Sequence, residues 1–320
     1  MSIRLFIIMS ILLVSNCENK SNLEREDFIL NEKDLIPEGL AFDKRTGVIY
    51  IGSTYKRKIV QIKPNGVVTD FISTETDGIW GVVGMEVDEK RGVLWVNTAH
   101  ANEVMPLTNP NKEEDWMTGI LSYTIKQKKL IKRYDLNEPK GFFNDITVSE
   151  NGDVYATESV NNKIYRIESG KDELQLFLDP KGFTFLNGIT YVDSLKVLFV
   201  ASTQGIFKVD VNSKKYTLLK TAKNINAKKI DGLAYYHNFL IGHQSSKVSK
   251  FYLNTDQTEI PKVEILDTRK EFDSSTTGEV GNGYYYYIVN SQISSGIDYE
   301  NRTLKPLDSL EKIIIRKLKL

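Results

Sequence analysis

The chain has 320 residues, of which 41% are hydrophobic and 10% are aromatic. This composition supports a folded core and excludes a disordered chain. The 42 Lys and Arg residues balance the 42 Asp and Glu residues, so the formal net charge is zero. A balanced chain has no electrostatic reason to bind nucleic acid, and no nucleic-acid partner is expected.

The N-terminal segment has the pattern of an export signal. Arg4 precedes an apolar run, residues 5–14, that is too short to span a membrane but has the length of a signal-peptide core. The sole cysteine, Cys17, follows directly. We predict a lipoprotein signal over residues 1–17, with Cys17 acylated, and hence an exported bacterial lipoprotein of the cell envelope, periplasmic or on the outer surface. The alternative is a plain secretory signal, because Asn16 stands where a small residue is usual.

A repeated pattern fills the rest of the chain: an apolar strand, a polar turn, a second apolar strand and a small polar residue. Equivalent positions at residues 38, 83, 144, 187, 231 and 277 lie 45, 61, 43, 44 and 46 residues apart. A spacing of about 40–45 residues is typical of one four-stranded propeller blade. The long second step is explained by a loop inserted at residues 101–118. We therefore predict an all-β, six-bladed β-propeller over residues 35–320, preceded by a polar tether over residues 18–34.

The two ends of the domain are expected to meet. Residues 312–320 alternate apolar and polar side chains, which predicts an outer strand of the last blade. Residues 28–30 are a candidate to pair there and close the ring. A linear β-solenoid is the structural alternative, but it requires shorter rungs than this repeat has.

Four of the six repeats carry an oxygen-bearing side chain at the same position, whereas Val83 and Thr277 occupy it in the other two. The first strand of each propeller blade lines the central channel, so these side chains should converge at one height. Two carboxylates and two amides suit a hard cation, Ca2+ or another divalent ion. The alternative, turn residues before glycine, does not account for the glutamate. The predicted ligands are Glu38, Asn144, Asn187 and Asp231.

The segments around these ligands, residues 37–39, 143–146, 186–189 and 230–233, resemble a known family. They are similar to the six-bladed calcium propellers of the senescence marker protein, gluconolactonase, paraoxonase and diisopropyl fluorophosphatase group, over about residues 35–300. The resemblance implies that the four side chains bind a catalytic calcium and that the substrate is a lactone, an ester or an organophosphate. Gluconolactonase-like members use the metal-bound aspartate as base, which here is Asp231.

The sequence departs from paraoxonases, which carry a pair of histidines beside the metal. Val83 stands near the first of these positions and Asn97-Thr98 near the second, with His100 two residues further on. Paraoxonase-type catalysis through this pair is therefore not expected.

The ends of the second strands should form a polar ring above the metal, since antiparallel neighbours end where the first strands begin. Glu158 and His243 in this ring are candidate general acids or bases. The alternative is that they cap strands or bind water. The predicted ring and its surroundings comprise Ser53, Thr98, His100, Glu158, Thr203, His243 and Asn290.

Together these features predict a calcium-dependent hydrolase of a small lactone or ester, in which Asp231 activates water with help from His243. The alternative is a non-catalytic, lipid-anchored propeller with a structural metal that binds a sugar or a protein partner. A sensor or scaffold with a vestigial metal cradle is a third possibility. The polar groups expected at the rim favour the enzyme, and the oligomeric state is left open.

Overall fold

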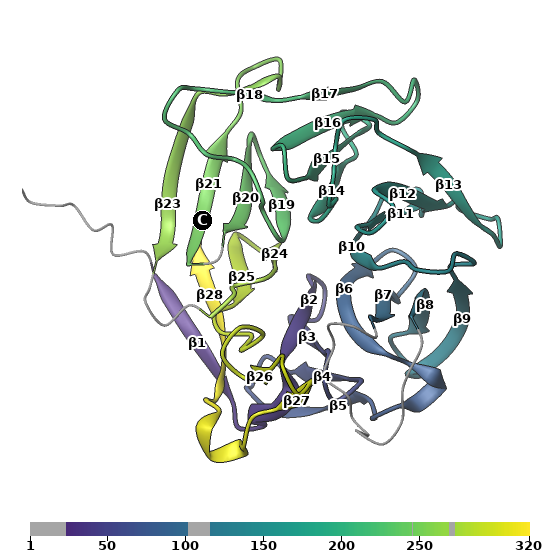
Figure 1. Ribbon diagram of the computed structural model, residues 1–320, viewed down its shortest axis with the longest axis vertical. Helices are drawn as coiled ribbons and strands as arrows, with labels where there is room; N and C mark the ends of the chain where they lie inside the picture. Colours follow the sequence, from purple (N-terminus) through teal and green to yellow (C-terminus); the bar gives the residue numbers. More distant parts are fainter. Residues whose placement is uncertain (1–23, 102–115, 245, 269–272) are drawn as a thin grey trace, which may run out of the picture.

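Six antiparallel sheets of four strands surround a central axis in the computed structural model, which describes residues 24–101, 116–244, 246–268 and 273–320 (Figure 1). Each innermost strand contacts the innermost strands of both neighbouring blades, so the ring is closed. The all-β, six-bladed propeller predicted from the repeat is confirmed. The innermost strands are β2 (Pro37–Asp43), β6 (Gly81–Asp88), β10 (Phe143–Val148), β14 (Ile189–Val192), β19 (Leu233–Tyr236) and β24 (Gly278–Gly281).

The other strands of the blades follow outward in the same order. The second strands are β3 (Val48–Ser53), β7 (Val93–His100), β11 (Val154–Glu158), β15 (Val197–Ala201), β20 (Phe239–Gln244) and β25 (Tyr284–Ile288). The third strands are β4 (Lys58–Ile62), β8 (Met117–Thr124), β12 (Lys163–Ile167), β16 (Ile206–Asp210), β21 (Lys247–Tyr252) and β28 (Ile313–Lys319). The outermost strands are β5 (Val68–Ile72), β9 (Lys129–Asp135), β13 (Leu174–Leu178), β17 (Tyr216–Leu218), β23 (Lys262–Thr268) and β1 (Arg25–Leu30).

Short elements decorate the ring. β18 (Lys220–Thr221) pairs in parallel with β22 (Glu259–Ile260), and β26 (Ile297–Asp298) forms a hairpin with β27 (Thr303–Leu304). The 3-10 turns are η1 (Lys33–Leu35), η2 (Thr76–Gly78) and η3 (Leu307–Ser309). The described part of the chain contains no helix with the length and apolar character needed to cross a membrane.

The hydrophobic core is divided among the blade interfaces. Six clusters of buried residues lie one at each interface between neighbouring blades. Because each blade is covered on both faces, its second strand is buried throughout rather than alternately, as β11 and β15 show. Edge-to-face aromatic pairs join these layers: the Phe71 ring lies 4.9 Å from Tyr50 and 6.4 Å from Tyr123 of the next blade.

The last blade is built from both ends of the chain. β28 follows β25, and β1 pairs with β28 as the outermost strand, with Phe28 opposite Ile315 and Leu30 opposite Ile313. The predicted pairing of residues 28–30 with the C-terminal strand is confirmed. The predicted tether over residues 18–34 is wrong from Arg25 onward. Polar residues occur there because an outermost strand exposes most of its side chains.

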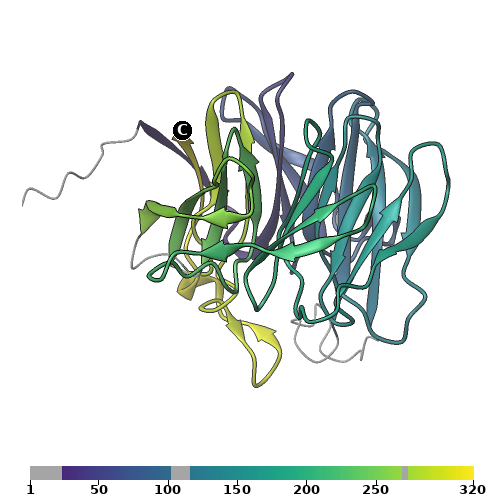
Figure 2. The same cartoon turned by 90° about the horizontal axis from the view of Figure 1, so that it is seen from above.

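The two faces of the ring are distinguished by strand direction. We call the face at which the innermost strands begin the N face, and the other the opposite face. The connection between β25 and β28 lies on the N face because β25 ends there, and Figure 2 shows its β26–β27 hairpin projecting from the ring.

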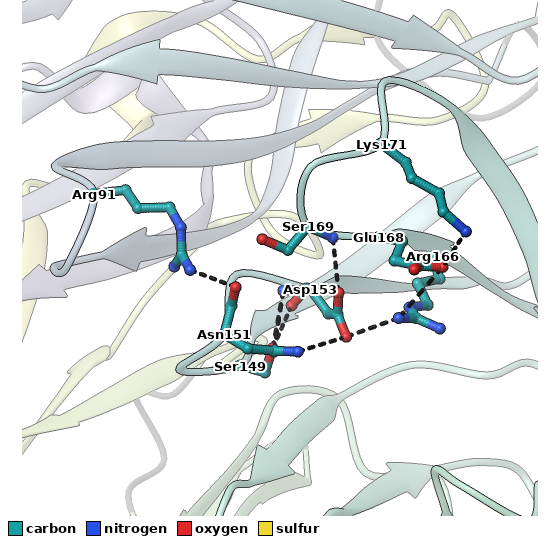
Figure 3. Close-up of polar contacts among 8 residues, drawn as sticks. All are labelled: Arg91, Ser149, Asn151, Asp153, Arg166, Glu168, Ser169 and Lys171. Carbon is teal, nitrogen blue, oxygen red and sulfur yellow. Dashed lines mark hydrogen bonds and ion pairs between the residues drawn. The ribbon is translucent and has the colours of Figure 1, made fainter.

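Polar contacts fasten blades together on the opposite face (Figure 3). Arg91, in the turn after β6, donates hydrogen bonds to the backbone carbonyls of Glu150 and Asn151 in the next blade. Asp153 accepts hydrogen bonds from the Arg166 guanidinium at 2.9 Å and from the Ser169 backbone at 2.8 Å. These contacts tie turns on this face together, whereas the predicted ligands lie at the other end of the innermost strands.

Candidate metal and active site

The innermost strands are irregular where they begin, and this irregularity presents side chains to the axis. The pairing of β2 with β3 shifts register between Pro37 and Leu40, and that of β10 with β11 between Phe143 and Ile146. β6 is shifted likewise. A bulge bends a strand and re-aims a side chain. Glu38 and Asn144 lie within two of these shifts, so local backbone geometry turns them toward the channel.

The four predicted ligands come together around one small cavity on the axis. Its volume is about 10 Å3, roughly the space that one water molecule or ion requires. All six blades line it, because the second and sixth blades, which carry no predicted ligand, also contribute residues. The cavity is lined by Glu38, Val83, Gly84, Asn144, Asp145, Asn187, Asp231, Gly232, Thr276 and Thr277.

The sixth blade contributes a different residue from the one expected. The Gly188 backbone donates a hydrogen bond to the Asp231 carbonyl at 2.7 Å, and Gly232 donates to the Thr276 carbonyl at 2.6 Å. Thr276 therefore occupies the position of Asp231, and the prediction of Thr277 is wrong by one residue. The degenerate first strand of this repeat made the alignment ambiguous.

In four of the six blades glycine follows the ligand position, because neighbouring blades approach each other closely there. A Cβ atom on Gly39 would lie 2.4 Å from the Val83 carbonyl oxygen, and one on Gly188 would lie 2.4 Å from that of Asp231. Real Cβ atoms do not approach backbone oxygens so closely. Glycine is therefore required at these positions by the close packing of neighbouring blades. The packing does not restrict the side chain of the residue before each glycine in the same way, so that side chain can bind a cation or a substrate.

Hydrogen bonds orient the amide ligands. The Asn144 Nδ2 donates to Ser159 Oγ at 3.0 Å, and Ser159 Oγ in turn donates to the Leu186 carbonyl. Because its amide nitrogen is held in this way, the side-chain carbonyl oxygen of Asn144 can face the cavity. Asn187 donates a hydrogen bond to the Asp231 carboxylate, which favours the charged form of that aspartate.

The cavity brings three acidic side chains together, and its burial opposes their ionisation. Burial raises the pKa of Glu38 to about 8, with further repulsion from Asp231 and Asp145. Burial also raises the pKa of Asp231 and of Asp145 to about 7 each. Within the described chain, no lysine or arginine is close enough to offset the charge of Glu38 or Asp231. A bound cation would supply the missing compensation.

The donor set fits a hard divalent cation. Glu38 and Asp231 supply carboxylate oxygens and Asn144 and Asn187 supply amide oxygens, all of the type that calcium and magnesium prefer. Asp145 is held differently, because its two oxygens accept backbone hydrogen bonds from Ile146 and Ile189. No group of three or more His, Cys, Asp or Glu side chains in the described ranges could hold a metal ion. Any cation here would depend on the amides.

A larger cavity opens beside the ligands. Its volume is about 440 Å3, and it is lined by two of them, Asn187 and Asp231, together with Phe185, Thr203, Lys229, Ile230, Ser274 and Ser275. Of the predicted rim, only Thr203 lies here. Sequence reasoning missed Phe185, Lys229, Ser274 and Ser275.

Backbone strain recurs two residues before the ligand position. Ile36, Phe185, Lys229 and Ser274 have φ values of 44°, 51°, 52° and 51°, in the left-handed region that such residues rarely adopt. Each costs of order 1–3 kcal/mol, and such residues cluster at functional sites. Three of the four line the 440 Å3 cavity. No sequence signal predicts them, because glycine or asparagine would be expected in this conformation.

His243, predicted as a supporting acid or base, lines neither of these two cavities in the structure. Its side chain is fully buried, Nδ1 lies 2.7 Å from Ser275 Oγ and Nε2 lies 2.5 Å from the Tyr285 hydroxyl. Burial lowers the pKa of His243 to about 3, so the ring is neutral at physiological pH. Both nitrogens are already engaged inside the interface between the last two blades, and neither faces a cavity.

Glu158, the other predicted acid or base, has the capping role that was the alternative expectation. Its Oε1 accepts backbone hydrogen bonds from Phe142 and Val160 at 2.9 Å each, and its Oε2 accepts one from Asn161 at 2.7 Å. The carboxylate therefore closes the loop after its strand, and it lines neither cavity on the axis.

Three other predicted rim residues bond to the backbone. Ser53 donates to the Leu35 carbonyl, and Thr98 accepts from the Trp80 backbone at 2.6 Å. Asn290 bonds to the backbone of Lys312 and Ile314 on both sides of its amide. Strand ends next to long loops must satisfy backbone groups, and these three side chains do so. His100 is buried with its ring 5.3 Å from that of Trp80.

The buried, neutral His243 predicts a pH dependence of stability. In the unfolded chain its pKa is ordinary, near 6.5, whereas in the folded chain it is about 3. Stability contributed by the neutral ring is complete above pH 6.5 and is lost as the pH falls toward 3, by up to about 1.4 kcal/mol per pH unit. Urea unfolding at pH 7 and pH 5 should show this loss, and His243→Gln should reduce the difference. An equal difference in both proteins would contradict it.

Comparison with known proteins supports the fold. No protein-family model matches the sequence, and no curated protein sequence matches it. Virginiamycin B lyase from Staphylococcus aureus is similar in structure, with a TM-score of 0.58, 17% identity, and coverage of 93% of this chain and 99% of the lyase. The Malassezia sympodialis allergen Mala s 1 has a TM-score of 0.68 and 14% identity, with coverage of 92% and 96%. The gluconolactonase XC5397 from Xanthomonas campestris has a TM-score of 0.62 and 11% identity, with coverage of 92% and 90%.

Proposed function

We propose that this protein is a metal-dependent hydrolase of a small lactone or ester and that its metal is calcium. The observation that carries the proposal is the convergence of Glu38, Asn144, Asn187 and Asp231 on one ion-sized cavity that adjoins a 440 Å3 cavity. A metal-dependent hydrolase needs a metal site with positions open to substrate, and this arrangement can provide them. The structural likeness to a gluconolactonase agrees with a lactone substrate.

The chain's own residues define the chemistry expected in the cavity. When bound, the ion supplies electrostatic polarisation of a carbonyl oxygen. Asp231 lines both cavities, so one carboxylate oxygen can remain available to accept a proton from an attacking water. Thr203 and Ser274 place polar groups along the larger cavity, where they can orient a substrate by hydrogen bonding.

A turnover assay tests the proposal directly. The purified protein should hydrolyse members of a panel of small lactones and aryl esters, lose this activity with a chelator and recover it with added calcium. Parallel additions of magnesium and manganese identify the preferred ion. Absence of turnover above buffer across lactones, esters and phosphotriesters, with metal binding shown by calorimetry, would contradict the proposal.

A non-catalytic propeller that binds a sugar or a protein partner is the second candidate. It is favoured by the structural roles of His243 and Glu158, which leave Asp231 as the single candidate base among the predicted catalytic residues. Metal binding without turnover would support this candidate, and the ion would then brace the ring.

We also propose that the protein is exported and anchored to a membrane through Cys17, which lies outside the described residues. The four strands of the last blade alternate in direction, so β1 begins on the opposite face, whereas the ligand cavity lies toward the N face. A lipid near the start of β1 would therefore leave the cavity directed away from the membrane.

Substitution of the anchor residue tests this part of the proposal. Cys17→Ser should move the protein from the membrane fraction to the soluble fraction, because no acyl chain can then be attached. Labelled palmitate should appear on the wild type and not on the variant. A membrane fraction unchanged by the substitution, with no label on the wild type, would contradict lipid anchoring.

A further inference from the structure

The larger cavity contains an unpaired cation beside the candidate metal ligands. Lys229 is exposed and lines the cavity two residues before Asp231. No acidic side chain in the described ranges forms an ion pair with it, whereas Lys56 and Lys163, in other turns of this face, each have a carboxylate within 4 Å. Its backbone is held in the left-handed region, and its N–H donates to the Ser202 carbonyl at 3.1 Å. The backbone conformation therefore fixes the position from which the Lys229 side chain extends.

The same cavity has an apolar side. Phe185 is 57% exposed, and like Lys229 it has left-handed backbone and lies two positions before a candidate ligand. Ile230 lies in the wall between Lys229 and Asp231. An exposed aromatic ring and an unpaired ammonium group in one cavity are complementary to a molecule with a flat or apolar body and an anionic group.

Resting on the proposed function, we propose that the substrate is an anionic lactone or ester, whose carboxylate or phosphate pairs with Lys229 while its body packs against Phe185. The two carboxylates of Glu38 and Asp231 balance the charge of a divalent ion, so the Lys229 ammonium remains available to pair with an anionic group of the substrate. Lys229 is a specificity-determining residue and takes no part in the proton transfer assigned to Asp231.

Paired esters with the same leaving group measure this preference. With calcium-loaded full-length protein, kcat/KM for mono(4-nitrophenyl) adipate is divided by that for 4-nitrophenyl hexanoate, after subtraction of hydrolysis in buffer. Lys229→Gln should lower this ratio by about tenfold, typical of a lost charge pair in a partly buried site. Lys228→Gln is the matched control, because Lys228 is exposed, adjacent in sequence and outside the cavity lining. An equal ratio in Lys229→Gln and wild type would overturn the proposal.

A binding experiment separates failure of this inference from failure of the proposed function. Calorimetry with benzoate, phenyl phosphate and benzyl alcohol requires no turnover. At least one anion should bind more tightly than the alcohol, with the stronger anion identifying carboxylate or phosphate, and Lys229→Gln should weaken that binding by about tenfold. If no ester is hydrolysed, the proposed function is contradicted, but the binding measurements still test whether Lys229 binds anions. Equal binding of all three probes, or binding unaffected by Lys229→Gln, would overturn it.

Discussion

Asp231→Asn should reduce kcat for lactone or ester hydrolysis by about two to four orders of magnitude, the usual contribution of a general base. Asparagine keeps the size of the side chain and one oxygen for a cation, but it cannot accept a proton from water. Asp231 is the only one of the four candidate ligands that carries a carboxylate and also lines the 440 Å3 cavity. Loss of the carboxylate should therefore remove the base while the cavity keeps its shape.

Initial rates with saturating substrate and calcium measure this effect, and calorimetry measures the calcium affinity of the same variant. Asp193→Asn is the matched control, because Asp193 follows the innermost strand of the fourth blade at the opposite face. It should leave kcat unchanged. If Asp231→Asn retains kcat within threefold of wild type, the base is another group, and Asp231 serves the metal alone.

The sequence was sufficient to predict the ring and the convergence of four polar side chains on its axis, because both depend on the repeat. Residues at the same position of successive repeats must lie at the same height around the axis. From the sequence, these glycines could also be turn residues. The short distances from a Cβ atom built on Gly39 or Gly188 to a backbone oxygen of the next blade show that close blade packing requires glycine. The ligand position therefore follows from spacing alone, except in the last blade, where Thr276 was hidden by a degenerate strand.

The rim could not be predicted in the same way. The direction of a strand predicts on which face of the ring the strand ends. It does not predict whether the last side chain points toward the axis or toward the neighbouring loops. Glu158 and Ser53 satisfy backbone groups of adjacent loops, and His243 enters a blade interface. The residues that line the cavity, Phe185 and Lys229, depend on left-handed backbone that their side chains disfavour. Tertiary contacts impose that conformation, so local propensity gives no warning of it.

The boundary of the domain shows a similar limit. β1 is rich in charge because it is an outermost strand, so its composition is that of a tether. Few of its residues face inward. Its strongest polar contact is the ion pair of Asp27 with Arg316, which lies almost the whole length of the chain away. Pairing of such distant segments cannot be read from composition.

That contact leads to the second large effect expected. Arg316 on β28 is fully buried, and its guanidinium donates to both carboxylate oxygens of Asp27 and to Asp267, with all three distances 2.6 Å. The Tyr287 hydroxyl donates to the same oxygen of Asp267 at 2.6 Å. One side chain thus joins the N-terminal strand, the C-terminal strand and β23 of the fifth blade. Removing it takes away the cation that the Asp27 and Asp267 carboxylates share.

Arg316→Met should therefore lower the free energy of unfolding by about 3 kcal/mol, the lower end of the range for breaking a buried ion pair, since the Asp27 side chain is 34% exposed. Lys317→Met is the matched control on the same strand. Lys317 pairs with Glu26 at 3.1 Å, but the two side chains are 26% and 59% exposed. Such a surface pair contributes at most about 1 kcal/mol. Urea unfolding measures the free energy of unfolding of both variants. If Arg316→Met proves no more destabilising than Lys317→Met, the contact of β1 with Arg316 is not needed to hold the ring closed.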